Sequence, residues 1–128
     1  MEKLFEEFVT TTKKLRAPGG CPWDIKQTHE SLIKCLREEC EEVVKAIENK
    51  DDENLKEELG DLLLNIIMQA DISEEEGKFN ISDVLKGVNG KLIRRHPHVF
   101  GTAKAATAEE GLALWKAAKE QEKKLKKK

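Results

Sequence analysis

Residues 37–69 constrain the fold more than any other part of the chain, because they carry two helical repeats of apolar residues joined by a short polar turn. In each repeat the apolar residues recur at intervals of three and four, which places them on one face of a helix. The first face is formed by Leu36, Cys40, Val43, Val44 and Ile47, and the second by Leu55, Leu59, Leu62, Leu63 and Ile66. Since the turn at residues 49–52 is short, the second helix should return antiparallel to the first. The sequence therefore predicts a helical hairpin.

Acidic side chains lie along the edges of both apolar faces. Glu39 and Glu42 follow the first face, and Glu58 and Asp61 follow the second, so the hairpin should bring these four carboxylates together. Further apolar residues widen the second face beyond the ~100° stripe of a surface helix, and we expect this helix to be central and largely buried. Ionised carboxylates are costly to bury unless they are paired or bind a metal, and oxygen ligands without a matching His or Cys favour Mg²⁺ or Mn²⁺. The alternative is a solvated face on which these glutamates pair with lysines.

Composition excludes several classes of protein. The net charge is only −2, so no global field favours nucleic acid or an anionic membrane. No apolar run reaches ~18 residues, and the N-terminus lacks the charged-then-apolar order of a signal peptide. Three cysteines form neither an even disulfide set nor a Cys-x-x-Cys pair, which is typical of free thiols in a reducing cytosol. We therefore expect a cytoplasmic protein with one domain over residues 1–128, a core at about 5–120 and a frayed, lysine-rich tail at 121–128.

The remaining pattern is helical throughout, with no β-strand or hairpin signal. A loop rich in Pro and Gly at residues 17–24 follows the first helix, Thr28 is the expected N-cap of the second, and Thr107 with Glu110 forms a capping box before the last. The expected helices span residues 2–16, 28–48, 52–75, about 80–95, and 108 onward. The sequence therefore predicts an all-α fold, a bundle of four or five helices.

Basic and aromatic residues suggest what the acidic site acts on. Mg²⁺ held by carboxylates usually completes its shell with water and phosphate oxygens, which favours a nucleoside polyphosphate as ligand. The cations available to the phosphates are Lys91, Arg94, Arg95 and Lys119, and Trp115 or Trp23 could stack on a base. For Trp23 the alternative is that it pins its loop onto the core. There is no Walker-type glycine loop, so backbone cradling of phosphates is not expected.

Other chemistries fit the sequence less well. A di-iron bundle requires a His three residues after the Glu of its motif, and neither acidic motif here is followed by one. Cys21 with His29 is a weak nucleophile pair, because a Cys-Pro step in a loop is more often structural. His96 and His98 flank a proline at a helix end and are not spaced like zinc ligands, so a helix-terminal role competes with phosphate contact.

Four blocks occur in order, CPWDIKQTHESL, EECEE, EELGDLLLNIIMQA and KLIRRHPHVFG, and together they resemble the MazG family of nucleoside triphosphate pyrophosphohydrolases over about residues 5–120. The resemblance implies Mg²⁺-dependent hydrolysis of a nucleoside triphosphate to the monophosphate and pyrophosphate, with a housecleaning role in the nucleotide pool. It also implies that the metal ligands are Glu39, Glu42, Glu58 and Asp61. Glu38 would orient or deprotonate the attacking water.

The same resemblance implies nucleotide contacts from Lys91 and Arg95, and from Trp115 and Lys119. Many relatives of this kind form dimers or tetramers, so we expect a homodimer or homotetramer. Some carry two such domains where this chain holds one, and regulation through a second domain would then be absent or supplied in trans. Two other hypotheses remain open: an enzyme specific for one deoxy or modified nucleotide, and a non-catalytic helical module that binds a nucleotide or a partner protein.

Overall fold

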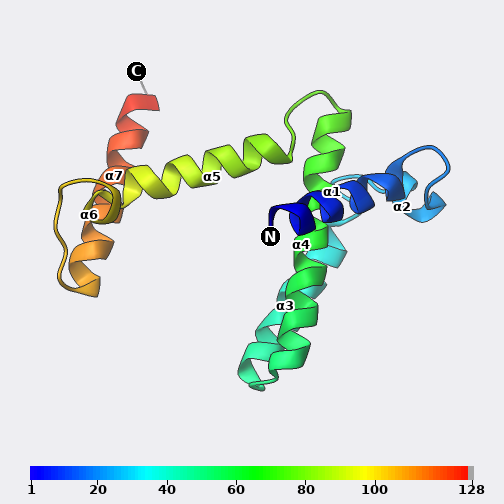
Figure 1. Ribbon diagram of the computed structural model, residues 1–128, viewed down its shortest axis with the longest axis horizontal. Helices are drawn as coiled ribbons and strands as arrows, with labels where there is room; N and C mark the ends of the chain where they lie inside the picture. The colour runs from blue at the N-terminus through cyan, green and yellow to red at the C-terminus, as the bar shows by residue number, and fades with distance from the viewer. Residues whose placement is uncertain (127–128) are drawn as a thin grey trace. The chain divides into compact units, whose positions relative to one another are not determined.

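The computed structural model describes residues 1–126, and these form helices with no strand, as Figure 1 shows. The all-α prediction is therefore confirmed. The helices of the described residues are α1 (Glu2–Arg16), α2 (Pro22–Lys26), α3 (Ile33–Glu48), α4 (Asp52–Glu75), α5 (Ile81–Arg95), α6 (Pro97–Phe100) and α7 (Ala108–Lys126). The sequence pattern missed α2 and α6, which are short and follow prolines. Residues 121–126 of the predicted tail continue α7, and its last two residues lie outside those described.

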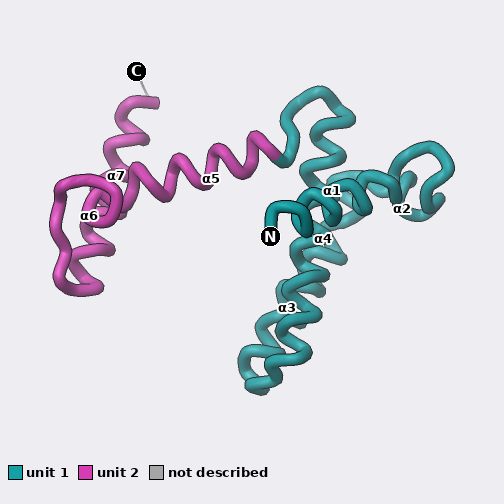
Figure 2. The backbone as a smooth tube through the Cα atoms, in the orientation of Figure 1, with its two compact units in different colours: residues 1–81 teal, residues 82–128 magenta. Residues whose placement is uncertain are grey.

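The described residues form two compact units, residues 1–81 and residues 82–126 (Figure 2). The first contains α1 to α4, and the second contains α5 to α7. No helix in the described part of the chain is long and apolar enough to cross a membrane. The single domain expected from the sequence stays a prediction.

The first unit is built on the predicted hairpin, in which α3 and α4 lie side by side and α1 packs against α4 (Figure 1). The side chain of Asp51 caps α4 by accepting a hydrogen bond from the backbone N–H of Asn54 at 3.2 Å. The hydrophobic core consists of Leu32, Met68 and Ile72, against which Cys35 and Leu64 pack. The core therefore lies around the C-terminal half of α4.

The N-terminal half of α4 is not buried, and here the prediction of a largely buried helix is wrong. Leu59 and Leu63 are 49% and 38% exposed, and Ile66, just past the midpoint of the helix, is 42% exposed. In contrast, Ile67 and Met68 are buried. On α3, Val44 and Ile47 are also exposed. The apolar surface of the hairpin is wider than α1 and α3 can cover, so a hydrophobic stripe is left facing solvent.

The segment between α1 and α3 is held by one arginine and one close backbone contact. The guanidinium of Arg16 donates hydrogen bonds to the backbone carbonyls of Asp24 at 2.6 Å and Gln27 at 2.9 Å. A Cβ at Gly20 would lie 2.4 and 2.5 Å from backbone carbonyl oxygens of α1, so only glycine fits there. Thr28 is not the N-cap of α3, because it exchanges hydrogen bonds with Ser31 in a separate turn and the helix begins at Ile33.

The second unit is formed by α5, α6 and α7. The predicted capping box before α7 is present in part. The backbone N–H of Glu110 donates to the hydroxyl of Thr107 at 3.2 Å, while the Glu110 carboxylate accepts from the backbone N–H of Ala106 instead of from Thr107. The box still satisfies N–H groups at the start of the helix. None of the three helices contains a fully buried residue.

Candidate active site

Three of the four predicted metal ligands come together between α3 and α4. One carboxylate oxygen each from Glu39, Glu58 and Asp61 lies within 4.8 Å of the other two. Glu58 and Asp61 are three residues apart and therefore share a face of α4, while the antiparallel neighbour α3 supplies Glu39. We call these three residues the acidic cluster.

The acidic cluster opposes its own ionisation. The pKa of Glu39 rises from 4.5 to about 7, first because its carboxyl shares a hydrogen bond with Glu58, and then because of partial burial and the nearby negative charges. The Oε2 atom of Glu39 is buried and has no hydrogen-bond partner among the described residues. A divalent cation would satisfy this oxygen and offset the repulsion, and an all-oxygen donor set suits Mg²⁺ or Mn²⁺. The residues present therefore fit a divalent metal.

Glu42 and Glu38, the other acidic residues predicted for the site, lie outside the three converging oxygens. Glu42 is half-buried, and its charge contributes to the raised pKa of Glu39. The side chain of Glu38 is 61% exposed and lies 4.0 Å from the Nζ of Lys34, one turn earlier on α3. Its role toward water stays a prediction.

The second unit brings together most of the predicted nucleotide contacts. The Arg95 guanidinium lies 5.3 Å from the ring centroid of Trp115, and the Nζ of Lys119 lies 5.1 Å from the same ring. Arg94 joins this group through Glu122, whose carboxylate accepts hydrogen bonds from both arginines. Sequence reasoning missed Glu122, because in the sequence it is one acid among the lysines of the chain's end.

Lys91 and Trp23 are not part of this group. Lys91 is exposed and has no ion-pair partner within residues 1–126. Trp23 belongs to the first unit, in α2, and is 55% exposed, which argues against the alternative that it pins the loop onto the core. Its side chain is left accessible.

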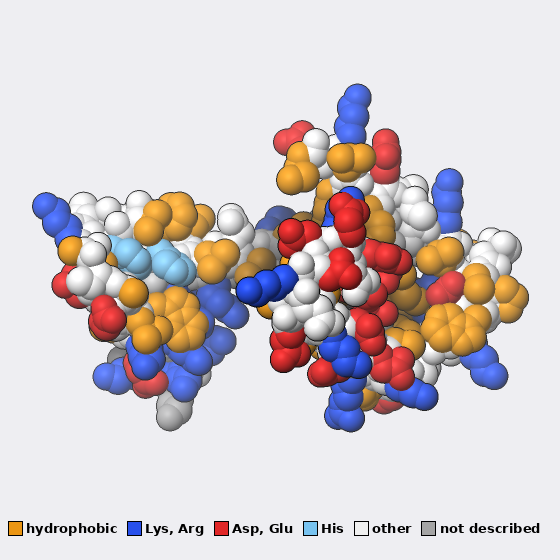
Figure 3. Space-filling model, turned by 90° about the horizontal axis from the view of Figure 1, so that it is seen from below, with side chains coloured by type: hydrophobic (Ala, Val, Ile, Leu, Met, Phe, Trp, Pro, Cys, Tyr) orange, Lys and Arg blue, Asp and Glu red, His pale blue; other side chains and the backbone are white. Residues whose placement is uncertain are grey.

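A cavity of about 480 Å³ lies beside Trp115. Figure 3 shows histidine side chains next to hydrophobic ones on this face of the second unit. The lining residues are His96, His98, Ala108, Gly111, Leu112 and Trp115. The Nδ1 of His98 is buried and has no hydrogen-bond partner among the described residues. Aromatic walls with an unused polar atom are suited to a flat heterocycle such as a nucleobase.

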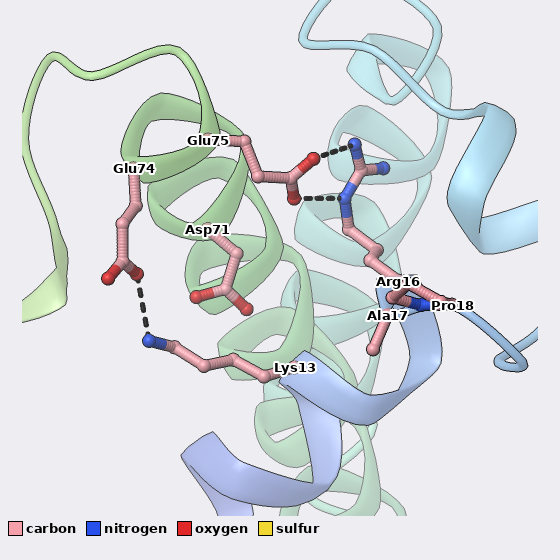
Figure 4. Close-up of a pocket in the computed structure, with 7 residues that line it drawn as sticks. All are labelled: Lys13, Arg16, Ala17, Pro18, Asp71, Glu74 and Glu75. Carbon is pink, nitrogen blue, oxygen red and sulfur yellow. Dashed lines mark hydrogen bonds and ion pairs between the residues drawn. The ribbon is translucent and has the colours of Figure 1, made fainter.

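Another cavity, of about 420 Å³, lies between the end of α1 and the end of α4 (Figure 4). Lys13 pairs with Glu74 at 2.8 Å, and Arg16 binds the carboxylate of Glu75 with two hydrogen bonds. Asp71 lies between these pairs, is 4% exposed, and has no hydrogen-bond partner for either carboxylate oxygen among the described residues. Burial raises its pKa. The sequence gives little signal for it, because Asp71 follows an apolar run that reads as core.

Comparison with known proteins identifies the family to which this chain is similar. The model of the MazG nucleotide pyrophosphohydrolase domain matches residues 27–100. A curated relative from Thermotoga maritima, named nucleoside triphosphate pyrophosphohydrolase/pyrophosphatase MazG, is 58% identical over 98 residues, which are 77% of this chain and 38% of the relative. The nucleoside triphosphate pyrophosphohydrolase of Escherichia coli K12 is 40% identical over 118 residues, 91% of this chain and 45% of that protein.

A solved structure is also similar, the crystal structure of a mazG-related protein from Thermotoga maritima. It superimposes with a TM-score of 0.72 at 31% identity and covers 94% of this chain and 99% of that one. The chain spans less than half the length of the two curated relatives. Because the family model matches more than half of its residues, the chain belongs to the family of the MazG nucleotide pyrophosphohydrolase domain.

Proposed function

We propose that this protein hydrolyses nucleoside triphosphates to the monophosphate and pyrophosphate, with Mg²⁺ or Mn²⁺ as cofactor. The observation that carries the proposal is the acidic cluster. Its three carboxylate oxygens lie within 4.8 Å of one another, and the hydrogen bond with Glu58, partial burial and the neighbouring negative charges raise the pKa of Glu39 to about 7. Such mutual repulsion costs stability unless a cation offsets it. The names of the relatives support the substrate class, since they are nucleoside triphosphate pyrophosphohydrolases.

In this proposal Glu39, Glu58 and Asp61 hold the metal, and Glu42 completes the set. The bound metal would lower the pKa of a water and neutralise charge on the leaving pyrophosphate. Water adds across the anhydride bond between the first and second phosphates, and Glu38 orients that water or accepts its proton.

The second unit supplies the nucleotide contacts of the proposed reaction. Arg94, Arg95, Lys91 and Lys119 bind phosphate oxygens, for which guanidinium groups are well suited because they can donate two parallel hydrogen bonds. Trp115 stacks on the base, and the cavity beside it accommodates the ring. Trp23 is the second stacking candidate, and its exposure leaves it accessible.

We also propose that the protein works as a homodimer or homotetramer. The exposed apolar stripe on α3 and α4 supports this, and α5 carries a second set of exposed apolar residues, Leu85, Val88, Leu92 and Ile93. Large contiguous apolar patches on a soluble protein usually mark an interface. The proposed setting is the cytosol, where the enzyme would clear unwanted triphosphates from the nucleotide pool.

A hydrolysis panel tests the proposed function. Common and deoxy nucleoside triphosphates are incubated with and without Mg²⁺, and pyrophosphate and orthophosphate are scored separately. The proposal predicts pyrophosphate release only with the metal. Turnover of one deoxy or modified nucleotide alone would favour the narrow-specificity alternative. Metal-independent nucleotide binding without turnover would favour a non-catalytic module.

A further inference from the structure

Glu122 binds both arginines that are proposed to contact phosphate. Its Oε1 accepts a hydrogen bond from the Nε of Arg94 at 2.8 Å, and its Oε2 accepts from the Nε and Nη2 of Arg95 at 3.1 and 2.7 Å. The Arg95 guanidinium also lies over the ring of Trp115. Glu122 therefore occupies the two-donor edge of Arg95 and one donor of Arg94.

A phosphate group would use the same donors. Carboxylates and phosphates both accept two parallel hydrogen bonds from the edge of a guanidinium, with similar geometry. The two arginines hold the pKa of Glu122 down at about 2, so its carboxylate is charged at neutral pH. A phosphate that binds the Arg95 edge must therefore displace an ionised group of the protein itself.

This contact can open without unpacking the unit. The backbones of α5 and α7 make no close approach within the described residues, so side chains alone join the two helices at this point. The side chain of Arg94 is 60% exposed, whereas those of Glu122 and Arg95 are 20% and 12% exposed. The hydrogen bond from Arg94 faces solvent, so water can replace it as the contact opens. The hydrogen bonds from Arg95 are shielded, and they open only when the Glu122 side chain turns away from it.

We propose that Glu122 is an internal competitor for the phosphate site formed by Arg94 and Arg95, and that it regulates the affinity of this site for substrate and product. The inference rests on the proposed function, because it assumes that these arginines bind phosphate. A ligand that binds only the open form has its apparent affinity reduced by the open fraction. An arginine pair that is open about one tenth of the time would thus bind phosphates about tenfold more weakly, which favours release of pyrophosphate.

The opposite role is that Glu122 merely positions Arg95 over Trp115 or ties α7 to α5. The two roles predict opposite changes in phosphate affinity when Glu122 is replaced. Removing a competitor tightens phosphate binding, whereas removing a positioning or structural group weakens it. The isosteric variant Glu122→Gln keeps the shape and removes the charge, and Glu120→Gln is a matched control, because Glu120 is on the same helix and lies 3.7 Å from Lys123.

The experiment is calorimetric titration of the full chain with inorganic pyrophosphate, in the absence of metal and at low salt. We expect Glu122→Gln to bind about five- to tenfold more tightly than the wild type, Glu120→Gln to match the wild type, and the added substitution Arg95→Gln to abolish the gain. Glu122→Ala serves as a second variant and should change in the same direction.

Unchanged or weaker binding in both Glu122 variants would overturn the inference, as would the absence of pyrophosphate binding by any of the proteins. The result is separable from the proposed function, because the titration involves no hydrolysis. Tighter pyrophosphate binding by Glu122→Gln, together with no hydrolysis in the panel, would support Glu122 as a competitor and reject the proposed hydrolase activity.

Discussion

Removing the negative charge of Glu39 should make the metal-free protein more stable at neutral and alkaline pH. The pKa of this carboxyl is about 7 in the folded chain, against an ordinary value of 4.5. Between these two values the folded state holds a proton that the unfolded state has lost, so stability falls as the pH rises from about 4.5 through 7. Above pH 8 both states are ionised, and the loss is complete.

The magnitude follows from the pKa difference. Each pKa unit corresponds to about 1.4 kcal/mol, so the raised pKa of Glu39 can lower the free energy of unfolding by at most about 3 kcal/mol. Glu39 is only half-buried, and solvent screening reduces this to about 1–2 kcal/mol. For a domain of this size such a loss lowers the Tm by roughly 4–10 °C.

The assay is thermal unfolding of the metal-free wild type and Glu39→Gln at pH 5, 7 and 8.5. We expect the wild type to lose stability across this range and the variant to remain nearly flat. Added Mg²⁺ should restore the wild type at pH 8.5, because a ligand that binds only the folded state raises its stability. The same pH slope in both proteins, or no effect of Mg²⁺ on the wild type, would refute the acidic cluster as a source of repulsion.

Three further predictions concern parts of the fold outside the acidic cluster. Asp71→Asn should raise the Tm at pH 8, because a carboxyl whose pKa is raised by burial costs stability once it ionises, here about 1 kcal/mol. An unchanged or lower Tm would contradict this. Gly20→Ala should destabilise the protein by more than about 1 kcal/mol in urea unfolding, because its Cβ would lie 2.4 Å from a carbonyl oxygen, whereas Gly60→Ala, which meets no atom within 4 Å, should stabilise α4 by up to about 1 kcal/mol. Leu63→Glu should reduce the mass measured by light scattering after gel filtration, and an unchanged mass would exclude the apolar stripe as the interface.

Local signals in the sequence predict the bounds of some helices closely. The expected bounds of α1 and α4 match the structure, because a Pro-Gly loop ends the first and Asp51 caps the second. The start of α3 is five residues later than expected, since Thr28 and Ser31 satisfy each other in a turn before the helix begins. A cap residue marks a turn, but it does not say which turn continues into a helix.

Periodicity predicts which residues share a face and leaves open what covers that face. The hairpin brings Glu39, Glu58 and Asp61 together as the three- and four-residue spacing implies. The same spacing led to the expectation that the whole apolar face of α4 is buried, and this is wrong for Leu59 and Leu63. Burial depends on neighbouring elements, and a repeat within one helix carries no information about them.

The contacts of Glu122 and Asp71 were the part that the sequence could not predict. Glu122 reads as one charge in a lysine-rich tail, yet it binds arginines 27 and 28 residues away. Asp71 reads as an interruption of an apolar run, yet it lies between two ion pairs that join α1 to α4. Both acids acquire their roles from tertiary packing, which no local pattern encodes.

The most direct test of the central claim is pyrophosphate release in the presence of Mg²⁺ by the wild type, Glu39→Gln and Glu41→Gln. Glu41 is an exposed neighbour on the same helix and serves as the matched control. If the acidic cluster holds the catalytic metal, pyrophosphate release is lost in Glu39→Gln and retained in Glu41→Gln. Release by Glu39→Gln at the wild-type rate would contradict the account, because the reaction would then not depend on the cluster.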